Sequence, residues 1–318
     1  MKDVKICLSI GAMDPQFRQM QQTLSGYAQV DVAGLGDFSL KGYDIFIGKK
    51  LDPEILATAD RLRAVFAYKT GVDDFPLAQL EEKGVVLVNS HVDAGYIAEY
   101  AIGLSMCLLY RITESDNKLR RGIWRDRADP YWKSFFSAKI GLVGYGHIGR
   151  TIHGYLRRNH IETYTIDRGG RYPEDIHLVS SLEQLCRQTD LLILSLPKTP
   201  ETDGMFDAEM LQLLRGKYIV NVGRSNCIDQ KALYEALSGN ILAGAAIDTW
   251  DRKPANMLDT LIPYAYPFDR LDNIVLSPHQ AMQVADGHER YVTDITEKVI
   301  RYIQTGALSD VVDLTKGY

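Results

Sequence analysis

Short apolar runs, many of them β-branched, alternate with helical patterns along nearly the whole chain. In the first ninety residues the runs lie at 4–10, 45–47, 64–68 and 85–88, and helical patterns at 15–27, 53–59 and 77–83 separate them. Two parallel strands need a crossover that can hold a helix, so this alternation predicts βαβ units and a parallel sheet. We therefore expect a small α/β domain from these ninety residues.

A second series of strand-like runs begins at Lys139. The runs cover residues 140–143, 163–166, 191–194, 218–222, 243–247 and 274–276, with helical stretches at 150–158, 208–214 and 230–237. Six such strands suit a doubly wound sheet with helices on both faces. Residues 285–305 are again helical in pattern, and we expect them to return to the first domain.

One longer helix is expected between the two series. From residue 94 to about 121, apolar side chains recur every three or four positions, which stacks them on one helical face. They are Ile97, Ala101, Leu104, Leu108 and Ile112. At 1.5 Å per residue, a helix of about 28 residues is long enough to bridge two domains.

Composition excludes several classes of protein. The 318 residues carry a net charge of −5 with no block of like charge, which argues against a nucleic-acid partner. The most apolar stretch, 101–110, is much shorter than the roughly 20 residues that span a bilayer, so no membrane segment is expected. The four cysteines form no Cys-x-x-Cys pair and no metal-ligand cluster, and they predict reduced thiols in a cytoplasmic protein.

A glycine-rich motif, Gly144-Tyr145-Gly146-His147-Ile148-Gly149, follows one predicted strand and opens a helical pattern. In a dinucleotide-binding turn the first glycine permits the tight turn and the second lets the backbone approach a pyrophosphate. The third lets the helix pack against the strand. The N–H groups at the start of the helix would then receive the phosphates.

Asp167 ends the next predicted strand, eighteen residues after Gly149. At that distance a carboxylate can accept hydrogen bonds from the ribose hydroxyls, and it would repel a 2′-phosphate. The pattern therefore favours NAD over NADP, although Arg168 and Arg171 lie close enough to weaken that preference.

Three further segments end or follow predicted strands of the second series. They are Asn221-Val222-Gly223-Arg224, Ala246-Ile247-Asp248-Thr249-Trp250 and Ser277-Pro278-His279. In an open α/β sheet this carboxyl edge is where ligands bind. With these segments the sequence resembles the D-isomer-specific 2-hydroxyacid dehydrogenases. The resemblance extends over nearly the whole chain, including Gly71-Val72-Asp73, Ile97-Ala98-Glu99 and Leu196-Pro197-Lys198-Thr199.

The resemblance implies a Rossmann NAD-binding domain, residues 96–283, inserted in a flavodoxin-like substrate domain made of residues 1–95 and 284–318. It also implies a homodimer formed through the nucleotide domain. The cofactor would contact Pro197, Thr202, Val222 and Gly223, and Asp248 would meet the nicotinamide carboxamide.

The resemblance also assigns the chemistry. Arg224 matches the arginine that holds the substrate carboxylate and carbonyl, a task that suits a planar guanidinium. His279 matches the acid/base, and an unperturbed imidazole titrates near working pH. Lys69, Thr70 and Gly71 match the loop whose backbone amides receive the carboxylate of a small anionic substrate. Lys69 adds a cation there, which would favour an anionic or doubly anionic substrate. No metal site is expected.

The sequence departs from the family pattern at Lys253, where a glutamate usually hydrogen-bonds the histidine. Three alternatives stay open. Lys253 faces the site and tunes it toward oxidation or toward a more acidic substrate, or it turns to solvent while Asp251 or water replaces the glutamate, or the site is catalytically weak. Ser225 stands where glycine usually follows the arginine, so its hydroxyl could reach the substrate. The stretch 255–266 is longer than usual and could form a lid or a dimer contact.

The sequence thus predicts an NAD-dependent oxidoreductase that interconverts a 2-oxo acid and a D-2-hydroxy acid. Two rivals share the fold. One is a dehydrogenase of another small anion, of the formate or phosphite type. The other is a catalytically weak NADH-sensing protein similar to the corepressors built on this fold.

Overall fold

A computed structural model of the chain describes residues 3–9, 15–34, 38–124, 131–252, 254, 260–285 and 287–318. The chain folds into two compact units. Residues 1–93 and 283–318 form one, the terminal unit, and residues 94–282 form the other, the central unit. Within the described ranges, no helix has the length and apolar character needed to cross a membrane.

The terminal unit contains a sheet of five parallel strands in the order β2-β1-β3-β4-β5. This is the flavodoxin-like strand order. The strands are β1 Lys5–Ser9, β2 Gln29–Val32, β3 Ile45–Gly48, β4 Ala64–Ala67 and β5 Val86–Val88.

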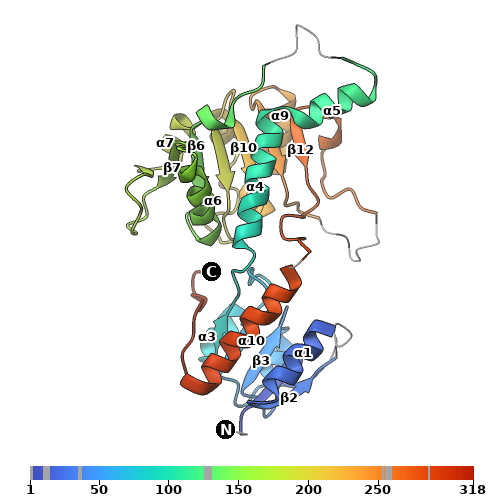
Figure 1. The fold of residues 1–318 in the computed structure, drawn as a ribbon, viewed down its shortest axis with the longest axis vertical. Helices are drawn as coiled ribbons and strands as arrows, with labels where there is room; N and C mark the ends of the chain where they lie inside the picture. Colours follow the sequence, from blue (N-terminus) through green and yellow to red (C-terminus); the bar gives the residue numbers. More distant parts are fainter. Residues whose placement is uncertain are drawn as a thin grey trace. The chain divides into compact units, whose positions relative to one another are not determined.

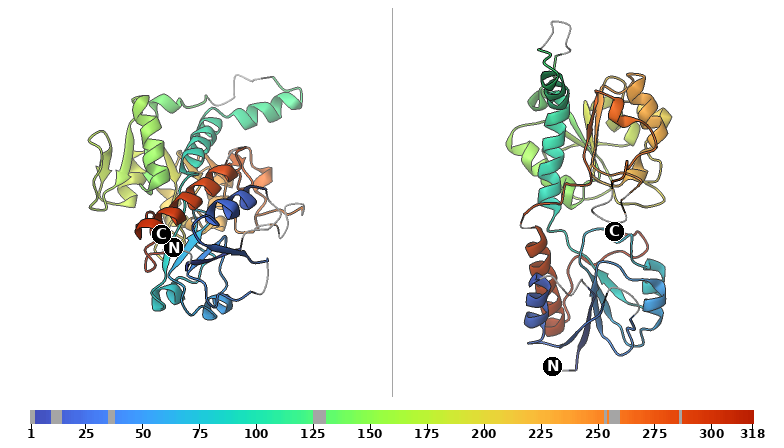
Figure 2. Two further views of the ribbon diagram at one scale, coloured as in Figure 1. Left: turned by 60° about the horizontal axis from the view of Figure 1, so that its bottom comes forward. Right: turned by 90° about the vertical axis from the view of Figure 1, so that its right-hand side faces the viewer.

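Helices cover both faces of the sheet in the terminal unit. On one face lie α1 (Pro15–Leu24) and α10 (Gly287–Thr305), which come from opposite ends of the chain and run side by side (Figures 1 and 2). On the other face, α2 (Pro53–Ala57) and α3 (Leu77–Glu82) bury apolar side chains against the sheet. The expected return of the last helix to the first domain is therefore confirmed.

The central unit contains seven parallel strands in the order β12-β11-β10-β9-β6-β7-β8. The order reverses between β6 and β9, and an open α/β sheet binds its ligands at such a switch point. The strands are β6 Ile140–Val143, β7 Thr163–Ile166, β8 His177–Val179, β9 Leu191–Leu194, β10 Tyr218–Asn221, β11 Gly244–Ile247 and β12 Ile274–Leu276.

Two apolar cores pack on the two faces of this second sheet, so the sheet is doubly wound. Successive residues of β9 show the alternation, because Leu192 faces one core and Ile193 faces the other. One core holds α4 (Ala94–Leu109) and α6 (His147–Arg158); the other holds α7 (Leu182–Gln188), α8 (Ala208–Gln212) and α9 (Gln230–Ser238). Figures 1 and 2 show α4 and α6 together on one side of the strands. The predicted fold class, two parallel-sheet α/β domains, is confirmed.

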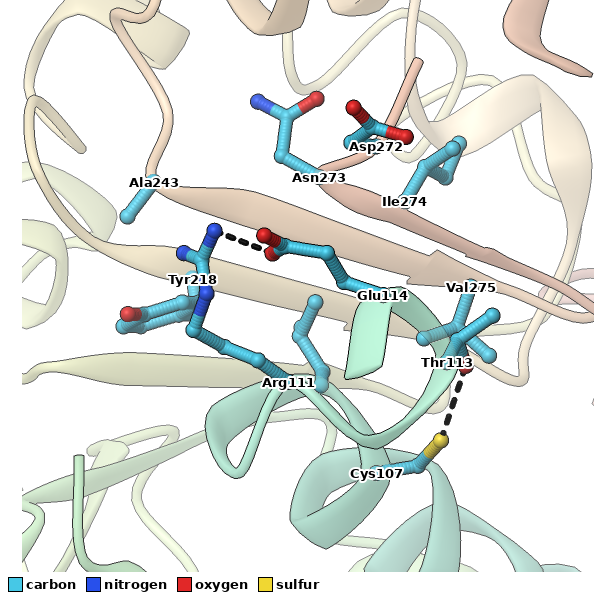
Figure 3. A pocket seen from close by; sticks show the side chains of 11 residues that line it. Cys107, Arg111, Thr113, Glu114, Tyr218, Ala243, Asp272, Asn273, Ile274 and Val275 are labelled. Carbon is cyan, nitrogen blue, oxygen red and sulfur yellow. Dashed lines mark hydrogen bonds and ion pairs between the residues drawn. The ribbon is translucent and has the colours of Figure 1, made fainter. Parts of the chain in front are cut away.

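The prediction of a single helix from residue 94 to about 121 was wrong, because the structure has two helices there. Arg111 takes a left-handed conformation, φ 55°, and divides the segment into α4 and α5 (Ile112–Arg120). One face of α4 is buried along its length as far as Leu109, but Ile112 is 50% exposed and no residue of α5 is buried. The buried face ends with α4, so packing no longer supports a straight helix beyond it. At the bend Glu114 forms an ion pair with Arg111 (Figure 3) and another with Lys118.

Candidate active site

The carboxyl ends of the central strands lie in register. Val143 pairs with Leu194, Leu194 with Asn221, Asn221 with Ile247, and Ile247 with Leu276. The segments that follow these strands therefore emerge at one edge of the sheet. They are the glycine motif, the loops after β9 and β10, Asp248, and the Ser277–His279 loop. Adjacent strands lie about 4.8 Å apart, so β10 and β12 are separated by roughly 10 Å at this edge.

The glycine motif forms the turn between β6 and α6. Gly144 has φ +102°, which side chains rarely allow, and a Cβ on Gly149 would lie 2.2 Å from the Gly144 carbonyl oxygen. A Cβ on Gly146 would meet no atom within 4 Å. The first and third glycines are thus required by the fold, whereas Gly146 leaves open space before the helix. His147 and Ile148 begin α6, whose N–H groups point toward that space and fit a pyrophosphate.

Asp167 follows β7 in a tight turn at the same edge. It is exposed, and its carboxylate accepts a 2.8 Å hydrogen bond from the Gly169 N–H. The Tyr172 hydroxyl closes the turn, because it accepts from the Arg168 N–H at 2.9 Å and donates to the Ile166 carbonyl at 3.3 Å. The turn thus presents an exposed carboxylate at this edge of the sheet, and the exposed Arg168 is its neighbour.

A buried histidine contacts the tyrosine of the glycine motif. His153 of α6 is 3% exposed, and its Nδ1 lies 2.7 Å from the Tyr145 hydroxyl. Burial lowers the pKa of His153, although Asp175, 3.9 Å away, opposes this shift. The Tyr145 ring also lies 5.4 Å from the Tyr172 ring. These contacts join the glycine motif to the Asp167 turn.

The loop after β9 is stabilised by its own threonines. The Thr202 hydroxyl is 2.8 Å from the Pro197 carbonyl oxygen and accepts from the Thr199 N–H at 2.9 Å. Thr202 is buried and Pro197 half-buried. The Thr202 hydroxyl therefore fixes the shape of this loop, and Pro197 is the more accessible of the two residues.

Arg224 follows β10 in a turn that buried Asn221 holds. The Asn221 side chain accepts from the Gly223 N–H and donates to the Arg224 carbonyl, both at 3.0 Å. A Cβ on Gly223 would lie 2.7 Å from two backbone atoms of Leu196, so only glycine lets the loops after β9 and β10 pack this closely. Val222 is buried beneath this turn, and the half-buried Ser225 starts a 3-10 helix, Ser225–Cys227.

The loop after β12 carries His279 and is fixed from several sides. His279 has φ 58°, an uncommon conformation for a residue with a side chain. The carboxylate of Asp248, 1% exposed, accepts hydrogen bonds from the Ser277 hydroxyl and from the N–H groups of Gln280 and Ala281. Trp250 Nε1 donates to the Ser277 carbonyl at 2.8 Å.

The candidate loop in the terminal unit lies after β4. Lys69 forms an ion pair with Asp74 of the same loop, and its ammonium lies 5.7 Å from the Phe75 ring centre. The Thr70 hydroxyl is 2.6 Å from both the Ser90 carbonyl and the Asp93 carboxylate. The side chains of both residues thus have intramolecular partners, and the half-buried Gly71 follows them.

Lys253 lies outside the described residues, as do positions 255–259 of the longer stretch. The three alternatives for Lys253 therefore stay open.

A separate pocket lies at the opposite edge of the central sheet, beside the bend between α4 and α5. Figure 3 shows the Arg111 guanidinium directed at Glu114, with Tyr218, Asp272 and Asn273 nearby. The cavity of about 20 Å³ has room for about one water molecule. It is too small for an organic substrate.

Sequence reasoning missed several residues that shape the site. Asn221 was named only as part of a motif, and Tyr145, His153 and Tyr172 were assigned no role in the site. A polar residue at the last position of an otherwise apolar strand, as in Tyr218–Asn221, is a signal that could have identified Asn221.

The chain matches one family model and is similar to several known dehydrogenases and reductases. The family model "D-isomer specific 2-hydroxyacid dehydrogenase, NAD binding domain" matches residues 102–281. D-3-phosphoglycerate dehydrogenase of Escherichia coli is 28% identical over 275 residues, which are 84% of this chain, and the match spans only 66% of that protein's length. Glyoxylate reductase of Thermofilum pendens is 28% identical over 252 residues, 76% of this chain and 72% of that protein.

A solved structure has the same fold over nearly the whole chain. It is the NADPH-dependent glyoxylate/hydroxypyruvate reductase from Sinorhizobium meliloti in complex with NADP and malonate. The TM-score is 0.79 with 22% sequence identity, and the match covers 99% of this chain and 98% of that one.

Proposed function

Because the chain belongs to the D-isomer-specific 2-hydroxyacid dehydrogenase family, we propose that it is an NAD-dependent oxidoreductase acting on a small 2-oxo acid or D-2-hydroxy acid. The observation that carries the proposal is the common edge of the central sheet. The glycine motif, Arg224 and the His279 loop all emerge there, on strands whose ends are in register. Dinucleotide and substrate groups can therefore meet along one edge.

The residues of the central unit fit a dinucleotide. Gly146 and the N–H groups of His147 and Ile148 would receive the pyrophosphate, and Asp167 would accept from the ribose hydroxyls. The Asp167 carboxylate would repel a 2′-phosphate, so we assign NAD rather than NADP. The loops that contain Pro197, Thr202, Val222 and Gly223 would line the rest of the cofactor. Bound there, the nicotinamide would supply or accept the hydride.

Arg224 and His279 would carry the acid–base chemistry of the central unit. The guanidinium would hold the substrate carboxylate and the carbonyl oxygen, and it would stabilise negative charge on that oxygen. His279 would donate a proton to the same oxygen during reduction and remove the hydroxyl proton during oxidation. Ser225, next to Arg224, would add a hydroxyl near the substrate.

The terminal unit would provide the substrate-binding loop. We assign the backbone N–H groups of residues 69–71 to the substrate carboxylate. The ion pair of Lys69 with Asp74 reduces the net charge that Lys69 adds, so a second anionic group on the substrate is not required.

A substrate panel tests the proposal. The purified chain is mixed with NADH and glyoxylate, hydroxypyruvate, pyruvate or 3-phosphohydroxypyruvate, and NADH absorbance is followed; NAD with the D-hydroxy acids, formate and phosphite completes the panel. We expect turnover with at least one 2-oxo acid and its loss in Arg224→Ala and His279→Ala. Turnover with formate or phosphite alone, or NADH binding without any turnover, would refute the proposal.

We also propose that the protein is a homodimer through the central unit. Helix α5 and the chain around it expose large apolar side chains: Ile112, Leu119, Ile123, Trp124, Tyr131, Trp132 and Phe136. Large apolar side chains exposed in this number along one stretch of the chain suit an interface, and a second copy of the chain would cover them. Leu119→Glu with Trp132→Glu should convert the dimer to a monomer in light scattering. A wild-type monomer would exclude this arrangement.

We assign the protein to the cytoplasm. All four cysteines are free thiols, and burial raises the pKa of Cys7 and Cys186 to about 12. Such thiols are unreactive packing residues, which suits a reducing compartment.

A further inference from the structure

The carboxylate of Asp248 makes hydrogen bonds on both sides of His279 in the sequence. It accepts from the Ser277 hydroxyl, two residues before, and from the Gln280 N–H at 2.8 Å and the Ala281 N–H at 3.2 Å. Asp248 itself is 1% exposed and follows β11, whose Ile247 pairs with Leu276 of β12. Asp248 therefore lies directly at the end of a buried strand, outside the loop that it holds.

The backbone that Asp248 holds is strained. His279 has φ 58°, a left-handed conformation that brings Cβ too close to the following carbonyl oxygen. Such a conformation persists only where its surroundings impose it. Two successive N–H groups that converge on one buried carboxylate provide that constraint, because charge-assisted hydrogen bonds are stronger than neutral ones.

The other supports of the loop act on Ser277. Trp250 donates to the Ser277 carbonyl, and the Tyr100 hydroxyl is 2.9 Å from the Ser277 hydroxyl. These bonds fix the entry to the loop, whereas the bonds from Gln280 and Ala281 to Asp248 fix its exit. His279 lies between the two anchor points.

We propose that Asp248 is a positioning residue that fixes His279 in its left-handed conformation. The family resemblance implies that it contacts the nicotinamide carboxamide. A carboxylate has about four acceptor sites, and the loop after β12 uses three of them, so Asp248 can hold the loop and still keep one site for such a contact. The consequence for turnover rests on the proposed role of His279, but the consequence for the loop does not.

The decisive variant is Asp248→Asn, which keeps the size of the side chain and replaces one acceptor oxygen with a donor. The matched control is Ser277→Ala, which removes one bond to Asp248 and keeps both N–H bonds. Amide hydrogen exchange at Gln280 and Ala281 reports on the loop, NADH binding on the cofactor, and NADH oxidation on turnover.

In Asp248→Asn we expect exchange at both amides to become about 10- to 100-fold faster, because two hydrogen bonds to a charged group are weakened. We expect kcat to fall about 100-fold because His279 is misplaced, with the Kd for NADH changed less than about threefold. Ser277→Ala should leave exchange at both amides within about threefold of wild type.

Unchanged exchange at Gln280 and Ala281 would overturn the inference, as would a tenfold weaker Kd for NADH with exchange unchanged. Absence of NADH binding or turnover in the wild-type protein would instead refute the proposed function, and the exchange result would still stand. If Asp248→Asn does not fold, Asp248→Glu keeps the charge but shifts it by one methylene, and faster exchange at the same amides is again expected.

Discussion

The Thr70 hydroxyl oxygen lies 2.6 Å from the carboxylate of Asp93, which is the last residue of the terminal unit before the chain enters α4. The Tyr291 hydroxyl of α10 is 3.1 Å from the same oxygen. Burial raises the pKa of Tyr291, with the Asp93 charge adding to the shift, so Tyr291 stays protonated and can donate. One threonine thus joins the loop after β4, the end of the unit and its C-terminal helix.

Thr70→Val should destabilise the terminal unit. The variant keeps the shape of the side chain but removes a hydrogen bond from Asp93, which is 3% exposed. Loss of a hydrogen bond to a buried charged group costs about 1–3 kcal/mol. Urea unfolding should show this loss for Thr70→Val, and a much smaller one for Thr70→Ser, which retains the hydroxyl. Equal stability of the two variants would mean that the hydroxyl does not hold Asp93.

Lowering the pH should reduce the stability of the central unit against unfolding, because His153 is buried in it. Burial lowers the pKa of His153 from its ordinary value, so the folded protein binds the proton less readily than the unfolded chain. The stability that this group contributes is therefore present above about pH 6.5 and is lost as the pH falls through its lowered pKa. Asp175 and Arg157 are the charged groups beside it.

The test compares urea midpoints of the wild type and His153→Gln at pH 7.5 and 5.0. Glutamine can still bond the Tyr145 hydroxyl but does not titrate. The wild type should lose more stability on acidification than the variant. If both lose the same amount, His153 does not bind its proton differently in the two states.

The alternating apolar runs were sufficient to predict the central strands, because strands buried on both faces are almost continuously apolar. The two strands that were missed, β2 and β8, lie at sheet edges. Their half-exposed sequences, Gln29–Val32 and His177–Val179, carry polar residues that resemble a loop. Helix α7 was also missed, although Ser181 caps it by accepting from the Gln184 N–H, a spacing that the sequence displays.

In the candidate site, too, some features could be predicted from the sequence and others could not. The glycine motif, Asp167 and Arg224 could be found from sequence because each follows a recognisable strand. The hydrogen bonds of Asp248 to Gln280 and Ala281 could not be predicted from the sequence. They join residues more than thirty positions apart, and they use backbone N–H groups, which any residue except proline has. Nor does the sequence show that Arg111 adopts φ 55°.

Tyr172→Phe should weaken the proposed preference for NADH over NADPH. Its hydroxyl closes the turn that carries Asp167, through bonds with the Arg168 N–H and the Ile166 carbonyl. Without it, the Asp167 carboxylate, which we propose repels a 2′-phosphate, is less fixed, and the Arg168 backbone can move. Fluorescence titrations should show that the ratio of the Kd for NADPH to the Kd for NADH falls by about three- to tenfold. This change corresponds to the free energy of about one hydrogen bond.

The control for Tyr172→Phe is Tyr155→Phe, a 40% exposed tyrosine on α6. It should leave both affinities unchanged. A Tyr172→Phe protein that binds both cofactors more weakly by the same factor would show that Tyr172 supports the fold and not the discrimination.

Gly146 and Gly149 should respond differently to alanine. In Gly149→Ala the new Cβ would lie 2.2 Å from the Gly144 carbonyl oxygen, a backbone atom that cannot move without opening the turn, so unfolding in urea should show a loss of roughly 3 kcal/mol. In Gly146→Ala the Cβ meets nothing within 4 Å, so stability should change by less than about 1 kcal/mol. The methyl group would instead occupy the space that a pyrophosphate needs, and NADH should bind at least about tenfold more weakly. Normal NADH binding by a stable Gly146→Ala protein would show that the phosphates do not approach the chain at this turn.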